Sequence, residues 1–551
     1  MTDNKNKKEP ISLSGEWRLI TDTDAMLDCL TAEAKLDQCG ISQSVPSVWN
    51  MHPELFNYDG VCWYSREFYA EAGAVRFSFG GVCNDAEIYL DGKRVFSHEG
   101  AYLPFSFVTE IPEKGNHRFT FRVSNSVNNE DTLPARRRDW KRYGGIIRDV
   151  TLEQIPRDHI EKMSLTYELS DDLSSAQVAT RVKFSGEKPA KYTLLEDGRA
   201  IGEYTILPGD NLIEFTVDDV RLWGVGAPEL YTFTLMGEGD SASVRTGFRR
   251  IGTRDGRITV NGEPVVILGV NRHEERYDRG HALTREDMLE DLALIEELGA
   301  NTVRGSHYPN SQEFLDLCDE RGILFWSELP MWQYGVAQAA SPVLRERLLR
   351  AGREMVEEYR HHPSIFCWGL HNECATETET LHGISTELAE LYRSLDQSRL
   401  ITYATDRPLT DVCYPLCDFI SVNRYPGWYG EDVGEWDSVL DELEKYAATQ
   451  DSGDKPIIIS EFGAGAIYGE HSPYLTKWSE EYQSLVLERS IEIFKRRGLG
   501  GFLVWQFADV RVSTEDALTR PRSFNNKGLL SERRERKLGF YAVKSGIERQ
   551  R

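Results

Sequence analysis

Up to about residue 251 the chain alternates apolar and polar residues with a period of two. Residues 75–79 and 117–123 are clear examples, and turn residues separate each such run from the next. This alternation predicts antiparallel β-strands that each bury one face. We therefore predict a jelly-roll β-sandwich over residues 1–156. A smaller immunoglobulin-like β-sandwich is predicted over residues 157–251, where residues 176–184 continue the pattern.

After residue 251 the pattern changes to short apolar runs that are each followed by a helical pattern. The first predicted helix begins after the capping residue Thr284 and ends at Gly299. Its apolar stripe consists of Met288, Leu292, Ile295 and Leu298. The apolar runs predict strands at residues 264–268, 300–304, 323–327, 365–370, 400–403, 419–422, 456–460 and 501–505. Eight parallel strands with intervening helices predict a closed (β/α)8 TIM barrel over residues 252–551, with its chemistry at the C-terminal strand ends.

The residues at these strand ends are rich in amide, aromatic and acidic side chains, which indicates contact with a ligand. Two carboxylates, Glu373 and Glu461, each come directly after a short apolar run. Glycoside hydrolysis needs two carboxyl groups, one to protonate the leaving oxygen and one to attack or to activate water. Structural ion pairing is the alternative for both residues. Glu274 and Glu328 hold similar positions, and position alone does not separate them from the first two.

Charge and composition narrow the possible partners. The net charge of -25 argues against nucleic acid and anionic membranes, and an anionic substrate would need local cations in its site. The first ten residues lack the apolar core of a signal peptide, and no apolar run is long enough to span a bilayer, so we expect a cytoplasmic protein. The nine cysteines, Cys413 and Cys417 included, lack zinc-site spacing and are predicted to be reduced and mostly buried.

Five segments occur in the order in which they are found in glycoside hydrolase family 2. They are Ser-His-Tyr-Pro at residues 306–309, Asn372 with Glu373, and residues 423–429, 460–463 and 504–509. The chain therefore resembles this family over its whole length and, within the family, the β-glucuronidases. The resemblance implies that the first sandwich is of the sugar-binding type. It also implies a retaining double displacement with Glu373 as acid/base and Glu461 as nucleophile, without a metal or cofactor.

The resemblance also implies roles for further side chains. Tyr425 is expected to hydrogen-bond the nucleophile. The residues expected to line the sugar site are His307, Asn372, Asn423, Tyr429 and Trp505. Asp139 resembles an aspartate of the sandwich domain that contacts sugar hydroxyls, and its alternative is a surface charge on a loop.

The sugar is predicted from residues 525–527. Asn525 and Lys527 resemble the Asn-x-Lys pair that holds the C6 carboxylate in β-glucuronidases, and the alternative is an exposed turn. An ammonium and an amide give a carboxylate charge-assisted hydrogen bonds that a neutral hydroxymethyl group does not replace. Arg520 and Arg522 are nearby cations, and the sequence does not decide which of them enters the site. Cys374, where many relatives have proline, and His371 depart from the family pattern and are expected to reshape the rim.

We therefore expect an exo-acting β-D-glucuronidase that acts on small β-glucuronides or on oligosaccharide ends. By analogy with relatives we expect a homo-oligomer. The same fold and glutamates would also serve a β-galacturonidase, a β-galactosidase or a β-mannosidase. A non-catalytic carbohydrate-binding protein is the alternative from another class, and the natural leaving group is left open.

Overall fold

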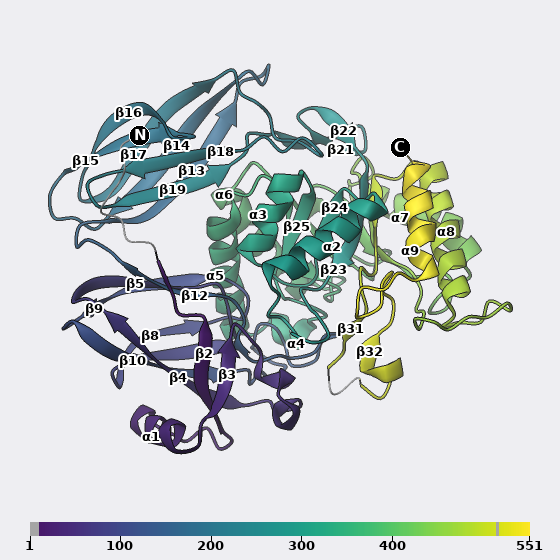
Figure 1. Ribbon diagram of the computed structural model, residues 1–551. Helices are drawn as coiled ribbons and strands as arrows, with labels where there is room; N and C mark the ends of the chain where they lie inside the picture. Colours follow the sequence, from purple (N-terminus) through teal and green to yellow (C-terminus); the bar gives the residue numbers. More distant parts are fainter. Residues whose placement is uncertain (1–9, 514–516, 551) are drawn as a thin grey trace. The chain divides into compact units, whose positions relative to one another are not determined.

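The computed structural model describes residues 10–513 and 517–550 and divides into two compact units (Figure 1). One unit holds the described residues up to Ser126 together with Tyr143–Arg249 and His361–Pro363. The other holds Val127–Arg142, Arg250–Arg360 and the described residues from Ser364 onward. Residues 1–9, in which the sequence predicts no signal-peptide core, lie outside the described part.

The first unit begins with a β-sandwich of two antiparallel sheets. Its principal strands are β1 (Ile11–Ser12), β2 (Gly15–Asp22), β3 (Ile41–Val45), β4 (Val61–Ala70), β5 (Gly73–Phe79), β7 (Asp85–Leu90), β8 (Lys93–Glu99), β9 (Phe105–Ile111), β10 (Gly115–Ser124) and β12 (Val150–Gln154). One sheet has the order β1-β12-β5-β9, and the other has the order β3-β2-β4-β10-β7-β8. The short strands β6 (Val82–Cys83) and β11 (Gly145–Ile146) pair with each other.

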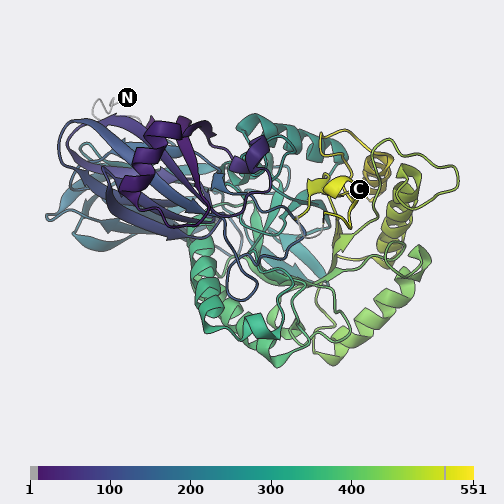
Figure 2. The ribbon, with the colours of Figure 1, turned by 90° about the horizontal axis from the view of Figure 1, so that it is seen from below.

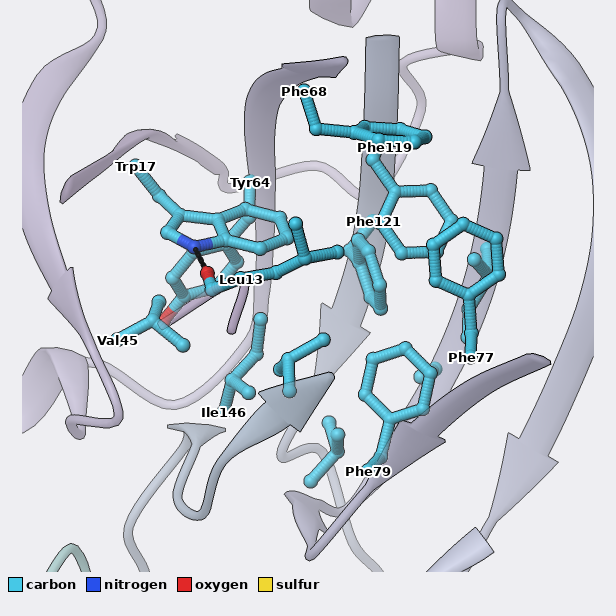
Figure 3. Packing of buried hydrophobic residues seen from close by; sticks show 14 of the residues in the cluster. Leu13, Trp17, Val45, Tyr64, Phe68, Phe77, Phe79, Phe119, Phe121 and Ile146 are labelled. Atoms are coloured by element: carbon cyan, nitrogen blue, oxygen red, sulfur yellow. Dashed lines mark hydrogen bonds between the residues drawn. The ribbon is translucent and has the colours of Figure 1, made fainter. Parts of the chain in front are cut away.

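Aromatic side chains fill the space between these two sheets (Figure 3). The rings of Phe77 and Phe119 stack with centroids 4.3 Å apart, and Phe121 meets Phe119 edge-on at 4.7 Å. The indole nitrogen of buried Trp17 donates a hydrogen bond of 2.9 Å to the carbonyl oxygen of Leu13. Rings packed in these offset and edge-on arrangements stabilise a core beyond their buried area.

One helix interrupts the sandwich where the sequence predicts only strands. It is α1 (Cys29–Cys39), capped by the side chain of Asp28, which accepts from the amide of Thr31. The helix buries Ala32 and Leu36 against a small apolar cluster that includes Trp63. A helix with so few apolar positions has a weak periodic signal.

A second sandwich follows in the same unit. Its strands are β13 (Ile160–Leu169), β14 (Ser175–Phe184), β15 (Ala190–Glu196), β16 (Arg199–Ile206), β17 (Gly209–Asp218), β18 (Tyr231–Met236) and β19 (Ser241–Thr246). The sheet orders are β13-β14-β17 and β16-β15-β18-β19, which fits the predicted immunoglobulin-like sandwich.

The second unit contains the closed barrel. Its parallel strands are β23 (Ile267–Arg272), β24 (Thr302–Gly305), β25 (Leu324–Glu328), β26 (Ile365–Asn372), β27 (Leu400–Thr405), β28 (Ile420–Asn423), β29 (Ile457–Phe462) and β30 (Gly501–Val504). The prediction of a first strand at residues 264–268 is wrong. Residues Glu263–Val265 form β22, which belongs to a separate sheet with β21 (Arg257–Val260) and β20 (Ile251–Arg254). The first barrel strand, β23, begins only at Ile267.

Helices surround the barrel strands, as Figure 2 shows. They are α2 (Arg285–Leu298), α3 (Gln312–Arg321), α5 (Pro342–Tyr359), α6 (Glu379–Leu395), α7 (Trp436–Thr449), α8 (Glu480–Arg497) and α9 (Leu538–Glu548), with the short α4 (Val336–Ala339) before α5. The predicted caps of α2 are confirmed, because Thr284 forms a capping box with Asp287 and Gly299 has a φ of +82°. Beyond α8, β31 (Val510–Arg511) pairs with β32 (Phe524–Asn525).

Two further expectations concern the cysteines and membrane-spanning helices. All nine cysteines are free thiols, and all except Cys39 are buried, which confirms that prediction. In the described ranges, no helix has the length and apolarity needed to cross a membrane.

Candidate functional site

A pocket of about 430 Å³ lies at the C-terminal ends of the barrel strands. The structure brings most of the predicted site residues together there. Those that line the pocket are Asp139, His307, Glu373, Asn423, Tyr425, Tyr429, Glu461, Trp505 and Lys527. The remaining two, Asn372 and Asn525, are fully buried behind this lining.

Glu461 is held in place on both of its carboxylate oxygens. It lies in β29, one residue before the end of that strand, and is 3% exposed. Oε1 accepts a hydrogen bond of 2.9 Å from Nη1 of Arg304, and Oε2 accepts one of 2.7 Å from the hydroxyl of Tyr425. Burial and the nearby charge of Glu461 raise the pKa of Tyr425, so its hydroxyl stays protonated as a donor. Glu461 is therefore a rigid carboxylate that faces the pocket.

Arg304 connects Glu461 to the other strand ends. This fully buried guanidinium donates two hydrogen bonds of 2.9 Å to the two oxygens of Glu328. It also donates to the side-chain oxygens of Asn271 at 3.0 Å and Asn372 at 2.7 Å. Such a network fixes the orientation of every member. The sequence analysis did not select Arg304, and its only signal was a cation at the end of an apolar strand.

The two competing glutamates have other partners. Burial by itself would raise the pKa of the Glu328 carboxyl group. Arg304 and His307 outweigh this effect and hold that pKa below its usual range. Glu328 is thus a fully buried anion that does not line the pocket. Glu274 accepts from the backbone amide of Ser311 at 3.2 Å and also lies outside the lining. Only Glu373 and Glu461, of the four glutamates considered, present carboxyl groups to the pocket.

Glu373 follows β26 directly and has a different environment from Glu461. Its φ of +50° is in the left-handed region, a strained conformation for a non-glycine residue. Oε1 accepts from the amide of Asn423 at 2.9 Å, and Oε2 accepts from the amide of Gln333 at 2.9 Å. Gln333 itself has a φ of +54°. Glu373 therefore receives hydrogen bonds from neutral amides, whereas Glu461 receives them from a guanidinium and a phenol.

The pKa of Glu461 reflects both its burial and the neighbouring carboxyl group. Burial and the charge of Glu373 raise the pKa of Glu461 to about 8, against the opposing effects of Arg304 and Tyr425. Two carboxyl groups that repel each other in one pocket retain a single proton below that pH. The cationic donor Arg304 favours negative charge on Glu461.

We expect the pair of Glu373 and Glu461 to make kcat/KM fall on the alkaline side of the pH profile. As the pH rises through about 8, the pair loses its one proton, no acid is left to protonate a leaving group, and kcat/KM should decline. The measurement is kcat/KM for an aryl glycoside from about pH 5 to pH 10. Asp406 also lines the pocket, and burial and Glu373 raise its pKa to about 7, so Asp406→Asn serves as the control. A limb that disappears in Asp406→Asn would contradict the assignment to the pair.

His307 and Trp505 form one wall of the pocket. Nδ1 of His307 lies 2.7 Å from Oε1 of Glu328, and its ring stacks on Trp505 with centroids 5.1 Å apart. Burial lowers the pKa of His307 despite Glu328, which indicates a neutral ring. With Nδ1 donating to Glu328, Nε2 is left as an acceptor.

Lys527 lies among aromatic rings on another wall of the pocket. It is 3% exposed, and its Nζ lies 5.0 Å from the ring centroid of Tyr429 and 5.7 Å from that of Tyr425. Within the part of the chain that the structure describes, Nζ has neither an ion pair nor a hydrogen bond. By contrast, the buried Lys537 pairs with Asp509 at 2.8 Å. A buried ammonium without a counter-ion is unfavourable unless a ligand supplies the anion.

Asn525, the predicted partner of Lys527, lies behind the pocket lining and contacts two residues of that lining. Nδ2 of Asn525 donates to Oδ2 of Asp139 at 2.7 Å, and Oδ1 of Asn525 accepts from the backbone amide of Lys527 at 3.4 Å. Arg520 lines the pocket and pairs with Asp139 at 3.0 Å. Arg522 pairs with Glu532 and does not line the pocket. Of these two arginines, Arg520 is therefore the one that lines the site.

The two departures from the family pattern do not reach the rim. Cys374 and His371 are fully buried, and neither lines the pocket. The ring of His371 hydrogen-bonds the hydroxyl of Ser385 at 2.9 Å, and burial lowers its pKa to about 3. The expectation that these residues reshape the rim is wrong.

Sequence reasoning missed the loop residues of the pocket. They are Arg137, Trp332, Gln333, Asp406, Glu431 and Thr519, together with Arg424, which belongs to the segment 423–429 but received no role from the sequence. Arg424 pairs with Glu431. These residues follow different strands, and no local pattern marks them as neighbours.

Three family models match successive parts of the chain. The family model for the TIM barrel domain of glycosyl hydrolases family 2 matches residues 251–550, that for the family's sugar binding domain matches residues 11–156, and a third family 2 model matches residues 158–249. A β-glucuronidase of Streptococcus agalactiae is 29% identical, over 90% of each chain.

Two solved structures are similar over almost the whole chain. A family 2 β-galacturonidase from Eisenbergiella tayi, bound to galacturonate, has a TM-score of 0.90 at 34% identity, covering 99% of this chain and 98% of that one. A β-glucuronidase from Ruminococcus gnavus in complex with D-glucuronic acid has a TM-score of 0.87 at 26% identity and covers 98% of each chain. The predicted fold class and the resemblance stated from sequence are confirmed.

Proposed function

Because the chain belongs to glycoside hydrolase family 2, we propose that this glycosidase is a retaining, exo-acting hydrolase of β-linked uronic acid glycosides, with β-D-glucuronides as its substrates. The single observation that carries the proposal is the buried ammonium of Lys527 in the pocket, which has no counter-ion among the residues that the structure describes. A carboxylate at C6 of the sugar would supply its counter-ion. Glu373 and Glu461 supply the two fixed carboxyl groups that glycoside hydrolysis requires.

The environments of the two glutamates fit the two roles of a double displacement. Glu461, hydrogen-bonded by Arg304 and Tyr425, attacks the anomeric carbon and forms a glycosyl ester. Glu373 gives its proton to the leaving oxygen, and in the second step takes a proton from the water that cleaves the ester. The side chain changes from acid to base between the two steps, and the anomeric configuration is retained.

Asn372 offers a further contact for the sugar. Its Oδ1 accepts from Arg304 and from Asn423, whereas its buried Nδ2 has no hydrogen-bond partner among the described residues. An unpaired buried donor is destabilising, and a sugar hydroxyl next to the reacting carbon would pair it. This supports the placement of the sugar between Asn372 and the two glutamates.

A β-galacturonidase is the second candidate. The E. tayi enzyme with that activity is 34% identical to this chain, compared with 26% for the R. gnavus β-glucuronidase. The two sugars share the C6 carboxylate and differ only in the configuration at C4, so Lys527 serves either one. Nitrophenyl β-glucuronide and β-galacturonide, assayed beside the β-galactoside and the β-mannoside, separate the candidates. Activity on a neutral glycoside together with inactivity on both uronides would refute the proposal.

Lys527→Met tests the carboxylate contact directly. The substitution keeps an apolar side chain among the rings of Tyr425 and Tyr429 and removes the charge. We expect kcat/KM on the preferred uronide to fall by about 10- to 100-fold, since a hydrogen bond to a charged group contributes about 1.5–3 kcal/mol. The activity ratio of uronide to the matching neutral glycoside should fall in parallel. A uronide rate within about twofold of wild type would remove Lys527 from substrate recognition.

A further inference from the structure

A second pocket of about 240 Å³ adjoins the first one. The two pockets share Arg137, Trp332 and Gln333 as lining residues, so they form a continuous cleft. Asn129 and Gln338 are among the residues that line only the second pocket. All of these residues belong to the same compact unit.

The second pocket lies on the side where a leaving group would depart. Gln333 lines both pockets and donates a hydrogen bond of 2.9 Å to Oε2 of Glu373, the carboxyl group assigned to protonate the leaving oxygen. Lys527 lines only the first pocket. A sugar whose carboxylate binds Lys527 and whose leaving oxygen meets Glu373 would direct its leaving group toward Gln333, which both pockets share.

The walls of the second pocket are held in place by hydrogen bonds between two loops. Nε2 of Gln338 donates to the carbonyl oxygen of Asn129 at 2.9 Å, and its Oε1 accepts from the amide of Gly335 at 2.8 Å. The hydroxyl of Tyr334 donates to the carbonyl oxygen of Thr132 at 2.6 Å. The loop at 127–142 is thus attached to the loop after β25, and the pocket is formed before a ligand binds.

The lining suits a sugar ring. Trp332 is half-buried and lies edge-on to buried Trp140 at 6.1 Å, so its ring is supported from behind. Its remaining exposed surface gives a sugar ring an apolar partner. Amide side chains of glutamine and asparagine around it provide hydrogen-bonding groups for hydroxyls.

One cation on this rim has no counter-ion. In the described ranges the guanidinium of Arg137 forms no hydrogen bond or ion pair, whereas Asp131 of the same loop pairs with Arg347 at 3.5 Å. Arg424 and Arg407, near the first pocket, pair with Glu431 and Asp406. In a chain with a net charge of -25, an arginine left unpaired beside a cleft attracts an anion.

We propose that the second pocket is a subsite for the leaving group and that it takes an anionic sugar ring, with Trp332 against the ring and Arg137 on its acidic substituent. The proposal rests on the proposed function, because the direction of the leaving group follows from the assigned roles of Lys527 and Glu373. It makes acidic oligosaccharide ends better substrates than neutral ones.

The test uses disaccharides with one fixed uronic acid at the non-reducing end. The leaving sugar is a uronate, a sulfated hexose or a neutral hexose, and nitrophenyl uronide is assayed in parallel. Wild type should have a kcat/KM about five- to tenfold higher on an acidic leaving sugar than on the neutral one. Comparison of the uronate with the sulfated hexose identifies the acidic group that is preferred.

Arg137→Ala should remove this preference, so that kcat/KM on the acidic and neutral disaccharides becomes equal within about twofold. Arg136→Ala, which removes the same charge one residue away and outside both pocket linings, should keep it. Equal losses on acidic and neutral disaccharides in Arg137→Ala, or no preference in wild type, would overturn the subsite. Inactivity of wild type on nitrophenyl uronide would overturn the proposed function as well, so the two failures are distinguishable.

Discussion

Replacing Glu461 with glutamine is expected to lower kcat on an aryl β-uronide by about 10⁴-fold or more. The amide keeps the size of the side chain but is not a nucleophile, so the glycosyl ester cannot form. Steady-state hydrolysis of nitrophenyl uronide measures the loss. Because Glu461 is an ion-pair partner of buried Arg304, a thermal unfolding curve should accompany the assay. Arg304 keeps its two hydrogen bonds to Glu328 in this variant, which favours retention of the fold.

Azide provides a control that distinguishes a nucleophilic role of Glu461 from any other role that activity requires. In Glu461→Ala, azide fits the space of the lost carboxylate and attacks the anomeric carbon from the same face. The product should be the glycosyl azide of inverted, α configuration, which NMR identifies. A Glu461→Gln variant as active as wild type would contradict the mechanism. Hydrolysis by wild type excludes the non-catalytic alternative, a carbohydrate-binding protein on the same fold.

The sequence predicted the architecture well where its patterns are long and regular. The stripe of α2 and the capping residues Thr284 and Gly299 need only local information. The first barrel strand was misplaced because the apolar run from residue 264 covers two elements, β22 and β23, and periodicity cannot divide so short a run. Helix α1 was missed because it buries only three of its residues.

Within the site, the sequence marks acidic candidates most clearly at the ends of barrel strands. Glu373 and Glu461 are recognisable because a carboxylate after a buried strand stands out in the sequence. Arg304 has no such local signal, and its importance comes from partners on several other strands. Trp332 and Gln333 lie on a loop whose path depends on tertiary contacts. The cytoplasmic location and the homo-oligomer stay predictions.

Replacing Glu373 with alanine should produce a loss that depends on the leaving group. A dinitrophenolate departs without a proton, so formation of the glycosyl ester should slow by less than about tenfold for the dinitrophenyl uronide. A sugar or alkyl leaving group needs the proton, and its kcat/KM should fall by about 10²- to 10⁴-fold. The measurement is steady-state kcat/KM for a series of leaving groups of rising pKa. The plot of log kcat/KM against the pKa of the leaving group should fall more steeply in the variant than in wild type.

Two comparisons tie this slope to proton donation by Glu373. Gln333→Ala removes the amide that donates to Oε2 of Glu373 but keeps the carboxyl group, so it should shift rates without steepening the slope. With azide, Glu373→Ala should form the glycosyl azide of retained, β configuration, because the ester on Glu461 is still made and azide then attacks it from the side of the missing acid/base. An α product from Glu373→Ala would exchange the roles assigned to the two glutamates. A loss of kcat/KM that is the same for every leaving group would remove Glu373 from proton donation. The opposite configurations of the two azide products therefore assign each glutamate to its own face of the sugar.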